Sequence, residues 1–462
     1  MSENNFPDEI FKAYDIRGIV DKTLTTDIVF KVGQALGSEA LKKGRDTIVT
    51  GRDGRLSGPS IQGALMDGIQ AAGCNVINIG MVPTPVVYYA AYKLETGCCV
   101  AVTGSHNPPD YNGLKMVIDD KTLSGEDIQA IKQRILDNDL SEGAGEAKDI
   151  DVKDEYIERI TSDIHMGRPL NIVVDCGNGV AGELGPRLLK SLGCQVTELF
   201  CDIDGHFPNH HPDPSQPENL NDLIAAVKAQ KADLGMAFDG DGDRLGVIAP
   251  DGKVIWADRQ MILYARDILK HNPGAEIIYD VKCSRTLHKE IEKAGGRPLM
   301  WKTGHSFIKA KLKETGAAFA GEMSGHLFFN DRWYGFDDAL YSAARLAEIL
   351  SNANESTQDI FANLPDTVST PELRLEGFAE GEHFAAMEKI AAKADFPDAQ
   401  RVATIDGLRV DWDDGFGLIR ASNTTPILVI RFEADNENAL KRIQDKFRAL
   451  IEAAVPGTKT PF

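Results

Sequence analysis

The strongest constraint on this chain is a strand–turn–helix–strand pattern that recurs three times, at a spacing of about 100 residues. Each copy opens with a short apolar strand and a turn rich in small or polar residues, and the copies begin near Thr47, Asn171 and Glu276. Apolar strands that alternate with amphipathic helices are typical of βαβ units and a largely parallel sheet. We therefore predict an α/β protein built from three duplicated α/β domains with mixed, mostly parallel sheets.

In each copy a further apolar strand ends in a loop dense with reactive side chains. These strands are 100–102, 234–238 and 317–320, and the loops are 103–108, 239–244 and 321–326. Ligands of open α/β sheets bind at the carboxyl ends of strands. Three such loops at equivalent places predict one shared site.

The domain boundaries follow from breaks in the pattern. A polar stretch with glycines follows Leu140, Asp251-Gly252 is a hairpin signal, and prolines interrupt the chain at Pro365 and Pro371. The C-terminal part mixes strands with two helices and does not repeat the earlier pattern, which indicates an α+β domain. The predicted domains are 1–150, 151–253, 254–365 and 366–462.

Composition limits the partners. The 462-residue chain has a net charge of −20, which argues against a nucleic-acid or anionic-membrane surface but permits a small anionic substrate. Its 7 cysteines are scattered without a CxxC pair, as in reduced cytosolic proteins. Neither a secretory signal nor a membrane-spanning run is apparent. We predict a cytoplasmic protein, monomeric, without nucleic-acid or membrane partners.

Ser105 is the candidate nucleophile of the first loop. A serine in a loop of this composition is often only a turn residue or a helix cap. Gly104, however, leaves room for a ligand or backbone to approach closely. His106 and Lys115 are nearby groups that could move protons or stabilise phosphoryl charge.

The second loop presents Asp239, Asp241 and Asp243 at alternate positions. On an extended, glycine-interrupted backbone these carboxylates would project to one side and converge on a hard cation. A calcium EF-hand would need Gly and Glu where the chain has Arg244 and Pro250. A solvated acidic turn fits poorly after the apolar strand 234–238. We predict a metal site, with Mg²⁺ as the ion and phosphate completing its shell.

The third loop and a loop near the C-terminus suit a phosphosugar. Glu322, Ser324 and His326 would share one face of an extended segment and suit sugar hydroxyls, although a polar strand edge would look the same. The segment 420–426, followed by Arg431, has the composition of a phosphate cradle. Its alternative is an ordinary turn before a proline.

One motif favours a different class of enzyme. Gly177, Gly179 and Gly182 fit the dinucleotide-binding pattern G-x-G-x-x-G after a strand, and Asp202 follows at a suitable distance. A nicotinamide-dependent oxidoreductase is therefore a competing prediction. The equivalent turns of the other two copies lack this pattern, and such a site would not explain the aspartates. We interpret these glycines as turn and packing residues.

Taken together, the loops resemble those of the α-D-phosphohexomutase family, and within it the bacterial phosphomannomutase/phosphoglucomutase branch. The resemblance runs over essentially the whole chain and is carried by five ordered motifs: 11–18, 103–108, 239–244, 321–326 and 420–424. It implies four domains around a central cleft, with the fourth binding the substrate's phosphate.

The resemblance also implies residue roles. Ser105 would carry a phosphoryl group, and Mg²⁺ would lie between it and Asp239, Asp241 and Asp243. Catalysis would involve Ser105, Lys115, His106, Arg17 and Arg244. Substrate binding would use Tyr14, Lys282, His305, Glu322, Met323, Ser324, Gly325, His326, Arg420, Ala421, Ser422, Asn423, Thr424 and Arg431.

The reaction implied is the reversible conversion of hexose 1-phosphate to hexose 6-phosphate, for mannose and glucose. It would pass through a hexose 1,6-bisphosphate, which also serves as activator, and this intermediate must turn over within the site. The sequence 321–326 resembles that of enzymes accepting both sugars, but the distinction from phosphoglucosamine mutase depends on Met323 alone. Phosphoglucosamine mutase is the nearest alternative, and a phosphosugar-binding protein without turnover is a further one.

Overall fold

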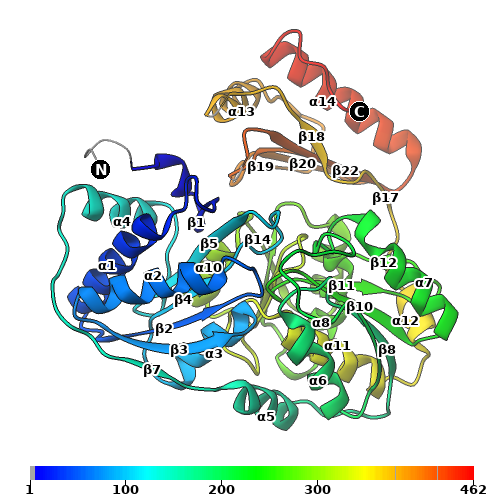
Figure 1. Cartoon of the computed structure of the whole chain (residues 1–462). Coiled ribbons are helices and arrows are strands. Elements are labelled where there is room, and N and C mark those ends of the chain that lie inside the picture. Colours follow the sequence, from blue (N-terminus) through cyan, green and yellow to red (C-terminus); the bar gives the residue numbers. More distant parts are fainter. Residues whose placement is uncertain (1–5, 380, 424) are drawn as a thin grey trace.

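The computed structural model describes residues 6–379, 381–423 and 425–462. The chain forms three α/β domains and a C-terminal α+β domain, as predicted. In Figure 1 the fourth domain, orange to red, lies above the other three. Each domain has its own sheet, so the predicted fold class is confirmed.

The sheet of the first domain has the strand order β1-β5-β4-β2-β3-β7, with β6 paired to β5. Helices α1, α2 and α4 pack together, and α3 contacts β2 and β4. Thr25 caps α1 by accepting a hydrogen bond from the amide of Ile28. The elements are η1 Asp8–Ile10, β1 Ile16–Ile19, α1 Thr26–Lys42, β2 Thr47–Arg52, α2 Gly58–Ala71, β3 Asn75–Met81, α3 Thr84–Lys93, β4 Cys99–Val102, β5 Tyr111–Ile118, β6 Lys121–Thr122, α4 Glu126–Leu136 and β7 Ala147–Asp149.

The second domain has the strand order β12-β11-β10-β8-β9. Strand β10 is buried along its whole length, which suits its position inside the sheet. Because β12 pairs with β11, this sheet extends past the predicted boundary at residue 253. The elements are α5 Lys153–Asp163, β8 Asn171–Asp175, α6 Ala181–Ser191, β9 Gln195–Leu199, η2 Pro217–Leu220, α7 Asn221–Gln230, β10 Leu234–Phe238, β11 Leu245–Ile248 and β12 Val254–Ile255.

The third domain has the strand order β14-β13-β15-β16. Its helix α11 is capped by Asp338, whose carboxylate accepts from the amide of Tyr341. The elements are α8 Ala257–His271, β13 Glu276–Asp280, α9 Arg285–Lys293, β14 Arg297–Trp301, α10 His305–Thr315, β15 Phe319–Gly321, β16 Leu327–Phe329, α11 Ala339–Asn352 and α12 Thr357–Ala362.

The fourth domain is an antiparallel sheet with two helices. Its strand order is β17-β22-β21-β20-β19, with β18 paired to β22. Helices α13 and α14 contact each other and both contact β21. The elements are β17 Val368–Ser369, β18 Leu373–Leu375, α13 Glu382–Ala392, β19 Arg401–Ala403, β20 Leu408–Trp412, β21 Gly415–Ala421, β22 Leu428–Ala434 and α14 Glu437–Ala454.

The hydrophobic cores divide the molecule unevenly. One continuous hydrophobic core contains buried residues of all of the first three domains, among them Val49 in the first and Leu364 at the end of the third. The fourth domain has a separate core, and a small cluster of Val281, Phe416 and Leu418 joins it to the third domain. The first three domains therefore form one packed body, to which the fourth is attached through a smaller contact.

The three reactive loops occupy equivalent positions in their sheets. Each follows a strand that is parallel to the first strand of its unit and antiparallel to the next strand along the chain: β4, β10 and β15. Duplication of the fold thus places one loop of each domain at the same topological position. In the part of the chain described, no helix has both the length and the apolar stretch needed to cross a membrane.

Candidate active site

Ser105 lies at the start of the loop that follows β4, and it is 1% exposed. Its Oγ is 3.1 Å from Nδ1 of His106 and 3.4 Å from Oδ2 of Asp239 in the second domain. Its backbone φ is +49°, in the left-handed region that non-glycine residues rarely adopt. The serine loop and the aspartate loop therefore meet at the serine hydroxyl.

Asp239, Asp241 and Asp243 are all fully buried. One oxygen from each lies within 4.8 Å of the other two. The backbone between them turns, with Gly242 at φ +75°, so the predicted extended arrangement is wrong. The turn is stabilised because Oδ1 of Asp239 accepts from the amides of Asp243 and Arg244. Convergence of the carboxylates is thus produced by a turn.

Lys115 compensates part of this negative charge. Its Nζ, on β5, lies 2.7 Å from Oδ2 of Asp241 and 2.5 Å from Oδ2 of Asp243. Burial alone would lower the pKa of Lys115, but the two carboxylates outweigh burial and raise it above its ordinary value. The side chain is therefore a fixed positive charge rather than a proton acceptor.

The electrostatics of the aspartates differ. Burial, reinforced by Asp243 and Asp241, raises the pKa of Asp239 well above its ordinary value. Burial also acts to raise the pKa of Asp241, but Lys115 and a hydrogen bond from Thr84 outweigh it and lower the pKa. One member of the triad thus tends to hold a proton while a neighbour is ionised.

The triad fits a hard divalent cation. Oδ1 of Asp241 and Oδ1 of Asp243 are buried and accept no hydrogen bond from the described residues. Buried carboxylate oxygens without a donor are costly unless a cation or a ligand binds them. Oxygen-only donors of this kind are those that Mg²⁺ prefers. The residues present are therefore suited to hold a metal ion.

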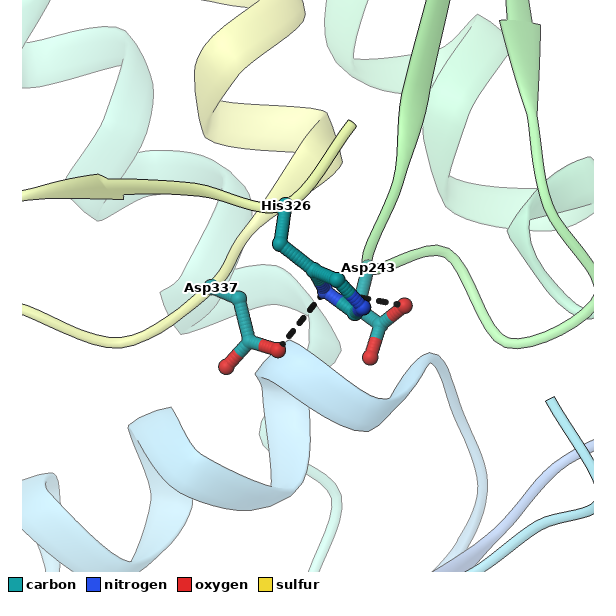
Figure 2. A group of neighbouring side chains, drawn as sticks. All are labelled: Asp243, His326 and Asp337. Atoms are coloured by element: carbon teal, nitrogen blue, oxygen red, sulfur yellow. Dashed lines mark ion pairs between the residues drawn. The ribbon is translucent and has the colours of Figure 1, made fainter. Parts of the chain in front are cut away.

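A second cluster connects the metal loop to the third domain. Figure 2 shows the imidazole of His326 between the carboxylates of Asp337 and Asp243. Nδ1 of His326 is 3.0 Å from Oδ2 of Asp337 and 3.6 Å from Oδ1 of Asp243. Arg244 donates from Nε to Nε2 of His326 at 3.1 Å. Because an arginine only donates, Nε2 must accept, which places the imidazole hydrogen on Nδ1.

The loop after β15 is a tight hairpin turn and not the extended row that we predicted. The amide of Glu322 donates to the carbonyl of His326, and Gly325 has a φ of +101°. Oγ of Ser324 is 3.4 Å from Oε2 of Glu322, and Oε1 of Glu322 accepts from the amide of Gly304. The side chains of Glu322 and Ser324 therefore lie beside each other, whereas the side chain of His326 points to Asp337.

Cations and imidazoles predicted from the sequence gather around these loops. Nη1 of Arg17 donates to Oδ1 of Asn107 at 2.5 Å. The rings of His305 and His326 have centroids 5.6 Å apart, and His305 also faces Tyr14. Burial, together with neighbouring cations, lowers the pKa of both His106 and His305 well below the ordinary value. These imidazoles are therefore neutral near pH 7.

A residue of the fourth domain reaches the first domain. The side-chain amide of Asn423 donates from Nδ2 to the hydroxyl of Tyr14. That hydroxyl donates to the carbonyl of Thr303 at 3.0 Å. Arg420 donates from Nε to Asp406, and its Nη2 has no acceptor among the described residues. Ser422 interacts with Thr425 at 3.1 Å. The predicted residue Thr424 lies outside the described residues.

The remaining predicted binding residues are placed as follows. Lys282 is nearly buried and pairs with Glu372 at 3.2 Å, while the amide of Met323 donates to Asp280. Ala421 ends β21. The guanidinium of Arg431 contacts Asp258 and Glu433 and donates to the carbonyl of Lys282. Arg431 thus holds the third and fourth domains together, and its role as a phosphate ligand stays a prediction.

Several residues of the site were missed from the sequence. Thr84 binds Asp241, and Lys309 pairs with Asp337 at 2.9 Å. Arg55 donates to carbonyl oxygens of the serine loop. None lies in a reactive loop, so only the tertiary structure identifies them. The available signal was the turn 51–58, which carries Arg55 together with Arg52.

The glycines of the G-x-G-x-x-G segment serve packing. A Cβ on Gly182 would lie 2.0 Å from the carbonyl oxygen of Cys201, and one on Gly177 would lie 3.1 Å from the ring of His210. Protein atoms thus occupy the space that a dinucleotide would need beside these two glycines. This agrees with their interpretation as turn and packing residues.

The fold and site define a four-domain α/β protein with a buried serine beside a candidate metal triad. Sequence models for the phosphoglucomutase/phosphomannomutase family match all four parts: alpha/beta/alpha domain I at residues 8–142, domain II at 154–252, domain III at 256–368 and the C-terminal domain at 376–450. The chain therefore belongs to the phosphoglucomutase/phosphomannomutase family.

Relatives of known name support the same family. The chain is 53% identical to the phosphomannomutase/phosphoglucomutase of Pseudomonas aeruginosa, covering 99% of this chain and 98% of that protein. It is 53% identical to a phosphoglucomutase of Neisseria gonorrhoeae, covering 96% and 97%. A crystal structure of a phosphoglucomutase/phosphomannomutase family protein from Burkholderia thailandensis superposes with a TM-score of 0.94, at 55% identity and 98% and 99% coverage.

Proposed function

We propose that this protein is a phosphomannomutase/phosphoglucomutase. It would interconvert hexose 1-phosphate and hexose 6-phosphate, for mannose and glucose, through a phosphoserine and a 1,6-bisphosphate. The observation that carries the proposal is the position of Ser105, whose buried hydroxyl lies 3.4 Å from the aspartate triad in a chain of this family. The names of the close relatives support the same activity.

In the proposed reaction the P–O bond of phosphoserine 105 breaks, and a new P–O bond forms to the free hydroxyl of the sugar phosphate. The hydroxyl proton passes to a neutral imidazole, for which His106 is the candidate. Transfer of the other phosphate back to Ser105 completes the cycle. Lys115, Arg17 and Arg244 stabilise the negative charge of the phosphoryl group.

Asp239, Asp241 and Asp243, with the phosphoryl oxygens on Ser105, would hold Mg²⁺. When bound, this ion would neutralise charge on the phosphoryl group during transfer. Oδ1 of Asp241 and Oδ1 of Asp243, which accept no hydrogen bond from the described residues, support this assignment. Because Lys115 already neutralises part of the triad, one divalent cation is sufficient to balance the remaining charge.

The sugar and its fixed phosphate would contact the third and fourth domains. Glu322 and Ser324 suit sugar hydroxyls, with His305 and Lys282 nearby. Arg420, Ser422 and Asn423 suit the phosphate that is not transferred. Nη2 of Arg420, which has no acceptor among the described residues, supports this role. The bisphosphate must bind in two orientations, so we propose that the fourth domain acts as a clamp that closes on substrate. We further propose a cytoplasmic monomer.

The decisive experiment offers mannose 1-phosphate, glucose 1-phosphate and glucosamine 6-phosphate to the full chain with Mg²⁺ and trace hexose 1,6-bisphosphate. We expect isomerisation of the first two. Conversion of glucosamine 6-phosphate alone would identify a phosphoglucosamine mutase, and turnover of none of the three would refute the mutase proposal.

Intact mass provides a companion test of the nucleophile. Ser105→Ala should abolish turnover and the added mass of one phosphoryl group, since no other hydroxyl would replace it. Ser60→Ala, at an exposed serine of the same domain, is the control and should change neither. A phosphoryl group retained on Ser105→Ala would assign the nucleophile elsewhere.

A further inference from the structure

Arg55, in the turn between β2 and α2, is a buried cation beside the serine loop and is 1% exposed. All of its guanidinium N–H groups have acceptors. Nε donates to Asp53 at 3.2 Å. Nη1 donates to the carbonyls of Pro108 at 2.5 Å and Tyr111 at 2.9 Å, and Nη2 donates to those of Ser105 at 3.0 Å and Asn107 at 2.6 Å. The five donors of an arginine are thus fully used.

Asp53 extends this attachment to the beginning of the loop. Its Oδ2 accepts from Oγ1 of Thr103 at 2.8 Å and from the amide of Gly104 at 3.2 Å. Because Asp53 also pairs with Arg55, one buried ion pair contacts the loop from Thr103 to Tyr111. Backbone carbonyls of an irregular buried loop need hydrogen-bond donors of this kind. The pair therefore replaces the hydrogen bonds that a helix or strand would have supplied.

The loop conformation depends on this contact. A Cβ at Gly104 would lie 2.4 Å from Cζ of Arg55, so only a glycine lets the guanidinium lie directly against the backbone. The next residue, Ser105, has a left-handed φ of +49°. A strained non-glycine conformation persists only where its surroundings impose it. Here Arg55 binds the Ser105 carbonyl, while the Ser105 amide donates to Thr103 at 2.7 Å.

The second domain covers the same loop from the other side. Nε2 of His211 contacts the carbonyl oxygen of His106. The ring of Phe207 lies against the Arg55 guanidinium, 5.3 Å from centroid to Cζ. The carbonyls of residues 105–108 are therefore bound by cationic or polar side chains of two domains.

We propose that Arg55 is a positioning residue for phosphoryl transfer. By binding the carbonyls of Ser105, Asn107, Pro108 and Tyr111, it imposes the backbone geometry that directs Oγ of Ser105 toward Asp239 and His106. Arg55 does not touch the reacting atoms. This inference rests on the proposed mutase function, and it adds a role for a turn that lies outside the reactive loops.

The test compares Arg55→Lys with Arg52→Lys in the full chain. A lysine keeps the charge but cannot bind four carbonyls. The Arg52 side chain, in contrast, donates only to the carbonyl of Asp53 among the described residues. Turnover of glucose 1-phosphate and the rate at which Ser105 gains a phosphoryl group from glucose 1,6-bisphosphate are measured, the latter by intact mass. Thermal unfolding of each variant is recorded in parallel.

We expect Arg55→Lys to lower kcat and the phosphorylation rate about 100-fold, the scale of a misplaced reacting group, with KM changed much less. Arg52→Lys should match the wild type. Peptides covering 103–111 should exchange amide hydrogens faster in Arg55→Lys. A folded Arg55→Lys with wild-type kcat and phosphorylation rate would overturn the proposal.

Gly104→Ala provides a second variant, which decides the matter if Arg55→Lys does not fold. The added methyl would displace the guanidinium from the backbone of the serine loop, so the same fall in kcat is expected. Unchanged kcat in Gly104→Ala would overturn the proposal.

The experiment separates the proposed mutase function from the proposed role of Arg55. An inactive wild type would refute the mutase function and this role with it, whereas an active wild type with equally active variants would refute only the role of Arg55.

Discussion

Nζ of Lys115, on a strand of the first domain, lies 2.7 Å from Oδ2 of Asp241 in the metal loop of the second. Both side chains are buried, and the lysine also contacts Asp243. The lysine thus joins two domains and neutralises part of the triad before any cation binds. This one contact should therefore affect the stability of the fold, the affinity of the triad for a metal ion and the stabilisation of phosphoryl charge.

Replacing Lys115 with Met should make stability depend more strongly on Mg²⁺. Loss of one partner of a buried ion pair typically costs about 3–5 kcal/mol, because the remaining charge is uncompensated. Mg²⁺ would restore that compensation, so the rise in melting temperature on adding Mg²⁺ should be larger in Lys115→Met than in the wild type. Lys121→Met, at an exposed lysine of the same sheet, is the control. Equal Mg²⁺ shifts in all three proteins would contradict this expectation.

Binding of Mg²⁺ should release a proton at pH values below the raised pKa of Asp239. Burial and the neighbouring carboxylates raise that pKa well above its ordinary value, so below it the metal-free protein retains a proton that the cation displaces. Calorimetric titrations in two buffers of different ionisation enthalpy measure this release. Mg²⁺ affinity should accordingly rise with pH. Identical binding heats in the two buffers would exclude the release.

Asp338 should make stability fall as pH rises. Burial raises its pKa to about 7 from 3.8. The folded state therefore keeps a proton that the unfolded state loses, so this contribution is fully present below about pH 4 and is lost as pH rises through about 7. Each pKa unit corresponds to about 1.4 kcal/mol.

Asp338→Asn keeps a side-chain acceptor for Tyr156 and for the cap of α11, and it removes the titration. The free energy of unfolding of the wild type, relative to this variant, should decline between pH 4 and pH 7 by urea titration. Asp27→Asn, at the exposed start of α1, is the control. A flat difference across that range would show that Asp338 does not titrate there.

Tyr14→Phe should weaken the contact between the first and fourth domains. The Tyr14 hydroxyl accepts from Asn423 and donates to Thr303. A lost hydrogen bond of about 1 kcal/mol corresponds to a change of about fivefold, which we expect mainly in KM. Solution scattering of the free variant should show a larger radius of gyration. Tyr92→Phe, at an exposed ring, is the control and should change neither quantity. An unaltered KM in Tyr14→Phe would show that this contact does not contribute to substrate binding.

Much of the fold was predictable because hydrophobic periodicity is local. Strand Leu234–Phe238 was located from its pattern at the bounds that the structure shows. The duplication of the α/β domains followed from the repeat. The backbone of the reactive loops was less predictable: loops 239–244 and 321–326 turn where we expected extended chain, since glycines at positive φ redirect them.

The sequence by itself determined the duplicated fold, the family, and the loops that carry Ser105, the aspartates and Glu322. These follow from residue type and order, which local patterns encode. Only the tertiary structure decided the partners of those residues: Lys115 between Asp241 and Asp243, Asp337 beside His326, and Arg55 beneath the serine loop. Such pairings join residues far apart in the chain, because buried charges and carbonyls require partners wherever packing provides them.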